Sequence, residues 1–391
     1  MNLKCETPGR TLVKKGFLAL YAFETARDML LGREPKLIRI LTDADLLELS
    51  RLFPDAAHGK AGGTEVYCEE SAVAVRFTIT DFAAERVVKI PGITRHKKQI
   101  ALNAAPSALF TTNCFFYDIE DDIFLDPLDQ YENLKRRVIR TIERPEVALE
   151  RCPTLALKTA RVAGETGFSI DETLMDFLKS RGDVKLCRVN EGVVDDFNAI
   201  CLSGRAFEAF SLLDEWGVLG RILPELTALK DVYQDKDHHP EGNGFRHTLM
   251  TLKCVKKPNR NLIMALLLHD TGKAITGRTA KRTRTFPNHS TASTSIAEKV
   301  LARFRFSAAD GDEVLFLVRH HMILDAVKRL PKGRLKGIFG SPYFPNLLEL
   351  YRADLESGFH SVENYYQAAR MYKEFLRVDK LKRQGVYASR R

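Results

Sequence analysis

The sequence lacks the features that would place the chain in a membrane. No apolar run approaches the roughly 18 residues that a membrane-spanning helix requires. The first residues, MNLKCETPGRTLVKKG, carry positive charge, but no apolar stretch of signal-peptide length follows them. Low-complexity segments and internal repeats are also absent. We therefore expect a cytoplasmic protein that has no membrane partner.

Paired cysteines are missing as well. The seven cysteines are scattered and odd in number, and no C-x-x-C pair occurs. This pattern is typical of reduced thiols in a cytoplasmic protein rather than of a disulfide framework. The remaining composition is ordinary for a globular chain, with 45% hydrophobic and 28% charged residues. A length of 391 residues favours two or three domains.

Positive charge is in excess. The formal net charge is +9, and the sequence pI is near 9.1. Such a surplus attracts anionic partners through long-range electrostatics and counterion release. It favours RNA, a small nucleotide or an anionic lipid without distinguishing among them, and it leaves the oligomeric state open.

The periodicity of apolar residues changes along the chain and predicts an α+β protein. Residues 64–70 and 72–82 are rich in β-branched and aromatic residues, which indicates strands of a mixed α/β domain. Apolar residues recur with a helical period after about residue 141, with a loop expected at 276–290. The predicted parts are a head, a helical neck, an all-α domain and a basic C-terminal tail, at residues 12–140, 141–230, 231–365 and 366–391.

A buried helix that ends in His-Asp is the most informative local pattern. Residues 261–268, NLIMALLL, are apolar on nearly every face, which predicts a buried helix. His269 and Asp270 follow at its end, so two metal-capable side chains would be held at the edge of the core. Gly272 suits a helix C-terminus, and Lys273 can then point into the same cavity. For an isolated His-Asp pair, a structural ion pair is the alternative.

Further metal-capable side chains accompany this pair: His247, His289, the adjacent His320 and His321, and Asp354. Imidazole and carboxylate ligands suit Mn, Fe, Co, Ni or Zn, and Mg accepts the oxygen ligands. A bound divalent ion lowers the pKa of water and makes hydroxide available near neutral pH.

Two choices within this set stay open. Neighbouring residues on a helix differ by about 100° in direction, so His320 and His321 need not both reach a metal. Asp325 lies four residues after His321 and competes with Asp354 as the last ligand. We favour Asp354, because the resemblance described next places the final aspartate on a later helix.

The order His…His-Asp…Asp over residues 231–360 resembles the HD-domain phosphohydrolase superfamily. The segments HHPEGNGFRHTLMTL and LLLHDTGK are similar to the HD region of bacterial tRNA nucleotidyltransferases. The resemblance implies one or two divalent ions (Mn, Ni, Co, Fe or Mg), held by His247, His269, Asp270, His289, His320, His321 and Asp354. Asp270 would bridge two metals or orient hydroxide, and Lys273 would neutralise charge on a phosphoryl oxygen.

The N-terminal part resembles the head and neck of tRNA nucleotidyltransferases and bacterial poly(A) polymerases. The similar segments are RDMLLGREPK with TDA, FTTNCFFYD and PTLALKTARVAGETGFSID. Phe23 and Glu24 stand where the family has phosphate-cradling glycines, and Leu37 and Arg39 stand where it has metal-binding aspartates. Asp43 is interpreted as a helix cap. These departures predict a head that no longer transfers nucleotides.

Three functions follow from these patterns. The favoured one is a metal-dependent phosphohydrolase or phosphodiesterase that acts on RNA ends or small nucleotides, with a catalytically dead nucleotidyltransferase scaffold. Members with this HD arrangement hydrolyse 2′,3′-cyclic and 2′-phosphates. The alternatives are a protein that still transfers nucleotides and a non-catalytic RNA-binding protein, with tRNA as an expected partner.

Overall fold

A computed structural model of the chain describes residues 7–35, 37–54, 57–58, 65–70, 73–79, 93–181, 189–233, 242–280, 283–358 and 361–383. The chain divides into two compact units. Unit 1 comprises Met1–Cys152 with Phe168–Met175, and unit 2 comprises Pro153–Gly167 with Asp176–Arg391. The predicted boundaries of head, neck, helical domain and tail stay predictions.

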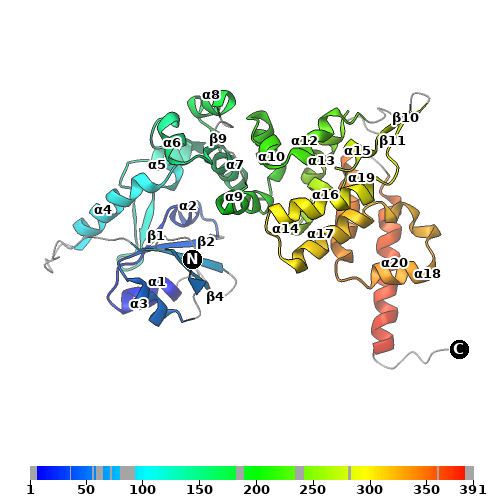
Figure 1. Ribbon diagram of the computed structural model, residues 1–391. Coiled ribbons are helices and arrows are strands. Elements are labelled where there is room, and N and C mark those ends of the chain that lie inside the picture. The colour runs from blue at the N-terminus through cyan, green and yellow to red at the C-terminus, as the bar shows by residue number, and fades with distance from the viewer. Residues whose placement is uncertain are drawn as a thin grey trace. The chain divides into compact units, whose positions relative to one another are not determined.

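Unit 1 is built on a seven-stranded mixed sheet with the order β3-β4-β5-β2-β1-β6-β7. Strands β1, β2 and β4 of this sheet are labelled in Figure 1. Strands β2 and β5 pair in parallel, and the other neighbours pair antiparallel. The strands are β1 (Leu20–Ala22), β2 (Leu37–Thr42), β3 (Ala57–His58), β4 (Glu65–Glu70), β5 (Val73–Ile79), β6 (Phe116–Asp118) and β7 (Ile123–Leu125). The predicted mixed α/β character of the N-terminal part is confirmed.

Short helices complete unit 1, and the apolar residues that they share with the sheet form its core. Leu12, Ile40 and Leu49, from a helix, a strand and a second helix, are fully buried in one cluster. The helices and remaining strands are α1 (Thr7–Lys14), α2 (Glu24–Leu30), α3 (Leu46–Leu52), α4 (Ile93–Ala104), α5 (Tyr131–Arg136), α6 (Pro145–Arg151), β8 (Val138–Ile139) and β9 (Ser169–Ile170), with α8 (Glu172–Arg181) crossing the unit boundary.

The cap of α3 differs from the expectation. Asp45, not Asp43, is the N-cap, and its carboxylate accepts a hydrogen bond of 2.8 Å from the backbone N–H of Glu48. Asp43 instead accepts a 2.7 Å hydrogen bond from the N–H of Leu18. The interpretation of Asp43 as a helix cap was therefore wrong, because α3 begins at Leu46, two residues later than a cap at Asp43 would require.

Unit 2 is helical, and its centre is the predicted apolar helix. Asn259 caps α14 through a 2.8 Å hydrogen bond from Leu262 N–H, and every residue from Leu262 to Leu268 is at most 1% exposed. The helices are α7 (Leu155–Thr166), α9 (Glu191–Cys201), α10 (Ala206–Glu215), α11 (Leu219–Ile222), α12 (Pro224–Thr227), α13 (Gly244–Cys254), α14 (Arg260–Leu268), α15 (Lys273–Thr276), α16 (His289–Arg303), α17 (Ala308–His320), α18 (Lys332–Phe339), α19 (Phe344–Ser357) and α20 (Glu363–Arg383).

Two segments of unit 2 differ from the expected pattern. Strands β10 (Arg278–Ala280) and β11 (Thr283–Thr285) pair antiparallel within residues 276–290, where a loop was expected. Three of the six residues in these strands are threonine, a residue type that is enriched in strands. Residues 366–383, expected in a basic tail, belong to α20. Among the described helices, none combines the length and apolar composition needed to cross a bilayer.

Candidate metal centre

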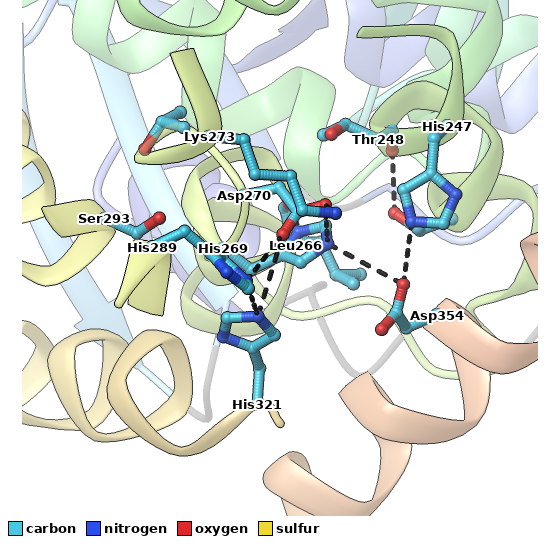
Figure 2. Close-up of polar contacts among 12 residues, drawn as sticks. His247, Thr248, Leu266, His269, Asp270, Lys273, His289, Ser293, His321 and Asp354 are labelled. Carbon is cyan, nitrogen blue, oxygen red and sulfur yellow. Dashed lines mark hydrogen bonds and ion pairs between the residues drawn. The ribbon is translucent and has the colours of Figure 1, made fainter. Parts of the chain in front are cut away.

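One triad of side chains comes from three helices of unit 2. His247 lies on α13, His269 directly follows α14, and Asp354 lies on α19 (Figure 2). The His247 Nε2 atom is 2.8 Å from Asp354 Oδ1, and the His269 Nε2 atom is 3.7 Å from the same oxygen. One ligand atom from each residue lies within 4.8 Å of the other two, so the three could hold one metal ion.

A second triad lies beside the first. Asp270, His289 at the start of α16 and His321 at the end of α17 bring their ligand atoms within 4.8 Å of one another. The Nε2 atoms of His289 and His321 are 3.1 Å apart, and Asp270 Oδ1 is 3.4 Å and 3.7 Å from them. Because Asp270 Oδ2 lies 3.4 Å from His269 Nε2, its two oxygens face the two triads.

Three of the histidines are oriented by the same kind of hydrogen bond to the backbone. The Nδ1 atoms of His269, His289 and His321 lie 2.7, 2.9 and 2.7 Å from the carbonyl oxygen three residues earlier in the chain. A carbonyl can only accept, so each Nδ1 donates and each Nε2 is left to face the cluster. This arrangement presents lone pairs to a cation, which is the tautomer a metal ligand requires.

Charge in the centre depends on burial and on the neighbouring groups. Burial opposes ionisation of Asp270, but Lys273 and His269 outweigh it and hold the Asp270 pKa well below its usual range. Burial would likewise lower the pKa of His269, yet Asp270 and Asp354 raise it overall. Burial, with His269 nearby, lowers the pKa of His321 to about 4, so that ring is neutral at pH 7.

Gly272 and Lys273, which directly follow the His269–Asp270 pair, contact residues of the second triad and of α16. A Cβ on Gly272 would lie 2.3 Å from the carbonyl oxygen of His289, so only glycine allows this approach. Its N–H donates a 2.8 Å hydrogen bond to Ser293 Oγ on α16. The sequence had indicated that Gly272 ends a helix. In the structure, Gly272 instead allows the close approach of the backbone at His289. The Lys273 ammonium lies 2.6 Å from Asp270 Oδ2.

A cavity of about 310 Å³ opens onto the centre. Its lining comprises His247, Asp270, Lys273, Met322, Asp325, Tyr351, Asp354, Leu355, Ser361 and Asn364. Residues from both triads thus lie on its wall, together with polar and apolar groups that a substrate would contact. The predicted cavity position of Lys273 agrees with this lining.

The structure brings together six of the seven predicted metal ligands and leaves His320 out. The His320 ring packs against Phe316, with ring centroids 4.8 Å apart, and it belongs to neither triad. Asp325 accepts a 2.8 Å hydrogen bond from Tyr351 Oη and also belongs to neither triad. Asp354 is therefore the better placed of the two competing aspartates.

Sequence reasoning missed two neighbours of Asp354 on α19. Ser357 Oγ lies 3.4 Å from His247 Nδ1 and donates to the carbonyl of Asp354, and Tyr351 lines the cavity. Both residues lie three positions from Asp354, which places them on its helix face. That spacing is the signal that would have identified them.

In unit 1, three of the positions that depart from the nucleotidyltransferase pattern, Phe23, Glu24 and Arg39, lie close together. The Arg39 guanidinium lies 2.9 Å from Glu24 Oε1 and 5.9 Å from the centre of the Phe23 ring. Phe23 has φ 59° and ψ −125°, a conformation that favours glycine. The backbone thus keeps a glycine conformation at a position where the family has glycine, although a buried phenylalanine occupies it.

The positive φ at Phe23 is strained for any residue other than glycine, so glycine should stabilise the protein more than alanine at this position, the reverse of the usual order. Phe23→Gly and Phe23→Ala both remove the ring, but only glycine relieves the positive φ, so we expect the glycine variant to be more stable by about 1 kcal/mol or more. Hydrogen exchange of the β1 and β6 amides would report the stability of unit 1. The same pair of variants at Phe116, in strand β6, should show alanine at least as stable as glycine. Equal exchange in the two Phe23 variants would contradict the strain.

Comparisons with known proteins agree with both resemblances. Residues 244–354 match the family model of the HD domain. The multifunctional CCA protein of Halorhodospira halophila is 30% identical over 223 residues, covering 55% of this chain and 52% of that protein. The multifunctional CCA protein of Laribacter hongkongensis is 29% identical over 216 residues, covering 54% and 52%. The chain therefore spans about half the length of the curated relatives it matches.

Solved structures share the fold over most of the chain. A tRNA-processing enzyme (apo form 2) has a TM-score of 0.57 at 15% identity, covering 97% of this chain and 99% of that one. The CCA-adding enzyme of Bacillus stearothermophilus in complex with CTP has a TM-score of 0.57 at 17% identity, covering 93% and 80%. Residues 244–354 are thus similar to HD domains, and the resemblance of the chain to tRNA nucleotidyltransferases is confirmed.

Proposed function

We propose that this protein is a metal-dependent HD phosphohydrolase that acts on phosphoesters of RNA ends or small nucleotides. The observation that carries the proposal is the pair of triads, which are linked by the consecutive residues His269 and Asp270 and contribute residues to the wall of one cavity. A structural ion pair would need only His269 and Asp270. Six converging ligand atoms exceed what such a pair requires.

The donor chemistry fits divalent cations. With Nδ1 donating to a carbonyl in both rings, His289 and neutral His321 direct Nε2 atoms at each other across 3.1 Å. Two lone pairs at that distance repel unless a proton or cation lies between them. The buried Nε2 atom of His269 lies 3.4 Å from Asp270 Oδ2 and 3.7 Å from Asp354 Oδ1, so it faces two carboxylates that could bind the same cation. We infer that His247, His269 and Asp354 would hold one ion, and Asp270, His289 and His321 a second.

A divalent ion such as Mn, Ni, Co, Fe or Mg would supply Lewis acidity and lower the pKa of water. The chain's own residues would do the rest. Asp270, kept ionised by Lys273 and His269, would orient the attacking water through a carboxylate oxygen. Lys273, on the cavity wall, would neutralise negative charge that develops on a phosphoryl oxygen.

RNA is the proposed substrate class because of the relatives and the charge. The curated relatives are named multifunctional CCA proteins, and two similar solved structures are complexes with a primer tRNA and with tRNA. The net charge of +9 favours a polyanionic partner. A tRNA or another RNA with a terminal phosphate or cyclic phosphate therefore fits better than an uncharged substrate.

The test combines metal content with hydrolysis. Purified protein should contain a transition metal and should hydrolyse bis-p-nitrophenyl phosphate and 2′,3′-cyclic AMP when Mn, Ni, Co or Mg is added in turn. Exhaustive chelation should abolish turnover, and re-addition of one of these ions should restore it. A metal-free protein that hydrolyses neither ester under any of these conditions would refute the proposal.

A second candidate is nucleotide addition by the head, as in the CCA-adding relatives. The comparisons favour this alternative over a head without transfer activity. The Arg39–Glu24 ion pair and the Phe23 ring support the opposite inference, because a cation and a buried ring are poor substitutes for metal-binding carboxylates and a phosphate cradle. Incorporation of labelled CTP or ATP into tRNA that lacks its 3′ end distinguishes a head that transfers nucleotides from one that does not. We expect no incorporation.

A further inference from the structure

The segment that follows the second triad is strongly basic. Between residues 319 and 336, Asp325 is the sole carboxylate. Six exposed cationic side chains, which we call the basic patch, occupy this segment: Arg319, Lys328, Arg329, Lys332, Arg334 and Lys336. They come from the end of α17, the 3-10 helix η4 (Ile323–Arg329) and α18.

The basic patch begins at the rim of the cavity. Met322 and Asp325 line the cavity, and Lys328 follows three residues later on η4. The Lys328 ammonium lies 3.6 Å from Glu363, whose neighbour Asn364 also lines the cavity. Lys328 therefore contacts a residue whose neighbour in the chain lines the cavity.

The part of the patch on α18 is open to solvent, since Lys332, Arg334 and Lys336 are all exposed. Gly333 and Gly337 lie four residues apart on α18, and a Cβ on either would meet nothing within 4 Å. Lys332 and Lys336 precede these glycines, so cations flank a bare, accessible stretch of backbone.

We propose that the basic patch binds the phosphodiester chain of an RNA whose terminal nucleotide occupies the HD cavity. This inference rests on the proposed function and decides between its two substrate classes in favour of RNA. A cavity of about 310 Å³ is at the lower end of small-ligand pockets, so a polynucleotide must continue outside it. Exposed lysine and arginine side chains gain affinity for such a chain by releasing its counterions.

The decisive variant is Lys332→Gln/Arg334→Gln/Lys336→Gln, because all three side chains are exposed and none lines the cavity. We expect it to bind a short single-stranded RNA with a 2′,3′-cyclic end about tenfold more weakly or worse, measured by fluorescence anisotropy. The slope of log affinity against log salt should decrease in magnitude by about 2. Hydrolysis of 2′,3′-cyclic AMP should stay within about twofold of the wild type, since a mononucleotide does not reach α18.

The matched control is Lys257→Gln/Lys299→Gln/Lys380→Gln, which removes the same charge from exposed positions elsewhere in unit 2. It should change RNA affinity much less than the α18 variant. Wild-type RNA affinity and salt slope in the α18 variant would overturn the inference. The inference would also be overturned if the α18 variant lost binding to phosphatidylserine vesicles while its RNA affinity stayed unchanged. If the wild type hydrolyses nothing, the proposed function fails, while the anisotropy measurements still decide the role of the patch.

Discussion

Replacing His321 by alanine is expected to remove the second metal ion and to reduce phosphoester hydrolysis by more than about a hundredfold, the loss that outer partners of metal ligands already cause. The same change at the adjacent His320 should leave metal content and turnover within about threefold of the wild type. The reason is direction: His321 faces Asp270 and His289, whereas His320 packs against Phe316. Inductively coupled plasma analysis and assays with 2′,3′-cyclic AMP measure both quantities.

Asp270 extends this prediction to both triads. Since one of its oxygens faces each triad, Asp270→Asn should lower the content of both ions and abolish turnover together. His247→Ala should affect the first triad alone, leaving residual metal at the second. Full hydrolysis in Asp270→Asn, or equal losses in the His320 and His321 variants, would contradict this assignment of ligands. Circular dichroism of each variant verifies that the helices remain folded.

Replacing Arg352 by methionine is expected to destabilise unit 2 by about 3 kcal/mol, since it leaves two carboxylates without their cation. The Arg352 side chain is 3% exposed, and it lies 2.6 Å from Glu349 and 2.5 Å from Glu356. It also donates to the carbonyl of Cys254, the last residue of α13. Arg352 thus ties α19, which carries Asp354, to the helix that carries His247. Urea unfolding, followed by fluorescence of the buried Trp216, measures the change.

The contribution of this ion pair should depend on pH in one direction. Burial opposes ionisation of Glu349, but Arg352 outweighs it, so the folded-state pKa of Glu349 lies below its ordinary value. The stabilisation is therefore present above about pH 4.3, the unfolded value, and is lost as pH falls through the folded pKa. The difference between wild type and Arg352→Met should shrink in acid. The control substitution of exposed Arg377 by methionine should lower the free energy of unfolding by less than about 0.5 kcal/mol at any pH. An equally small loss in Arg352→Met would contradict the proposed role of Arg352 in holding α19 to α13.

Local patterns accounted for the elements on which the site stands. The apolar run before His269 predicted a buried helix, and α14 is that helix. The same run placed His269 and Asp270 at the end of a rigid element, at the edge of the core. These predictions succeeded because periodicity and burial depend on residues that are near one another in sequence. The hairpin at 278–285 was missed because its short strands carry little periodicity.

Direction and long-range proximity were beyond sequence reasoning. The sequence offered His320 and His321 equally, and packing of α17 decided that one points inward and the other lies against Phe316. The sequence favoured Asp354 over Asp325 only through the resemblance, whereas the structure pairs His247 directly with Asp354, 107 residues away. The two spatial triads have no counterpart in the linear order of their members.

The sequence by itself determined the α+β class, the kinship of the C-terminal part with HD domains and the residue types available to a metal. Those properties follow from local periodicity and from the chemistry of individual side chains. Only the tertiary structure decided which six ligands converge, how Asp270 faces both triads and that the basic patch begins at the cavity rim. These depend on how helices distant in sequence pack, because packing fixes the direction of each side chain.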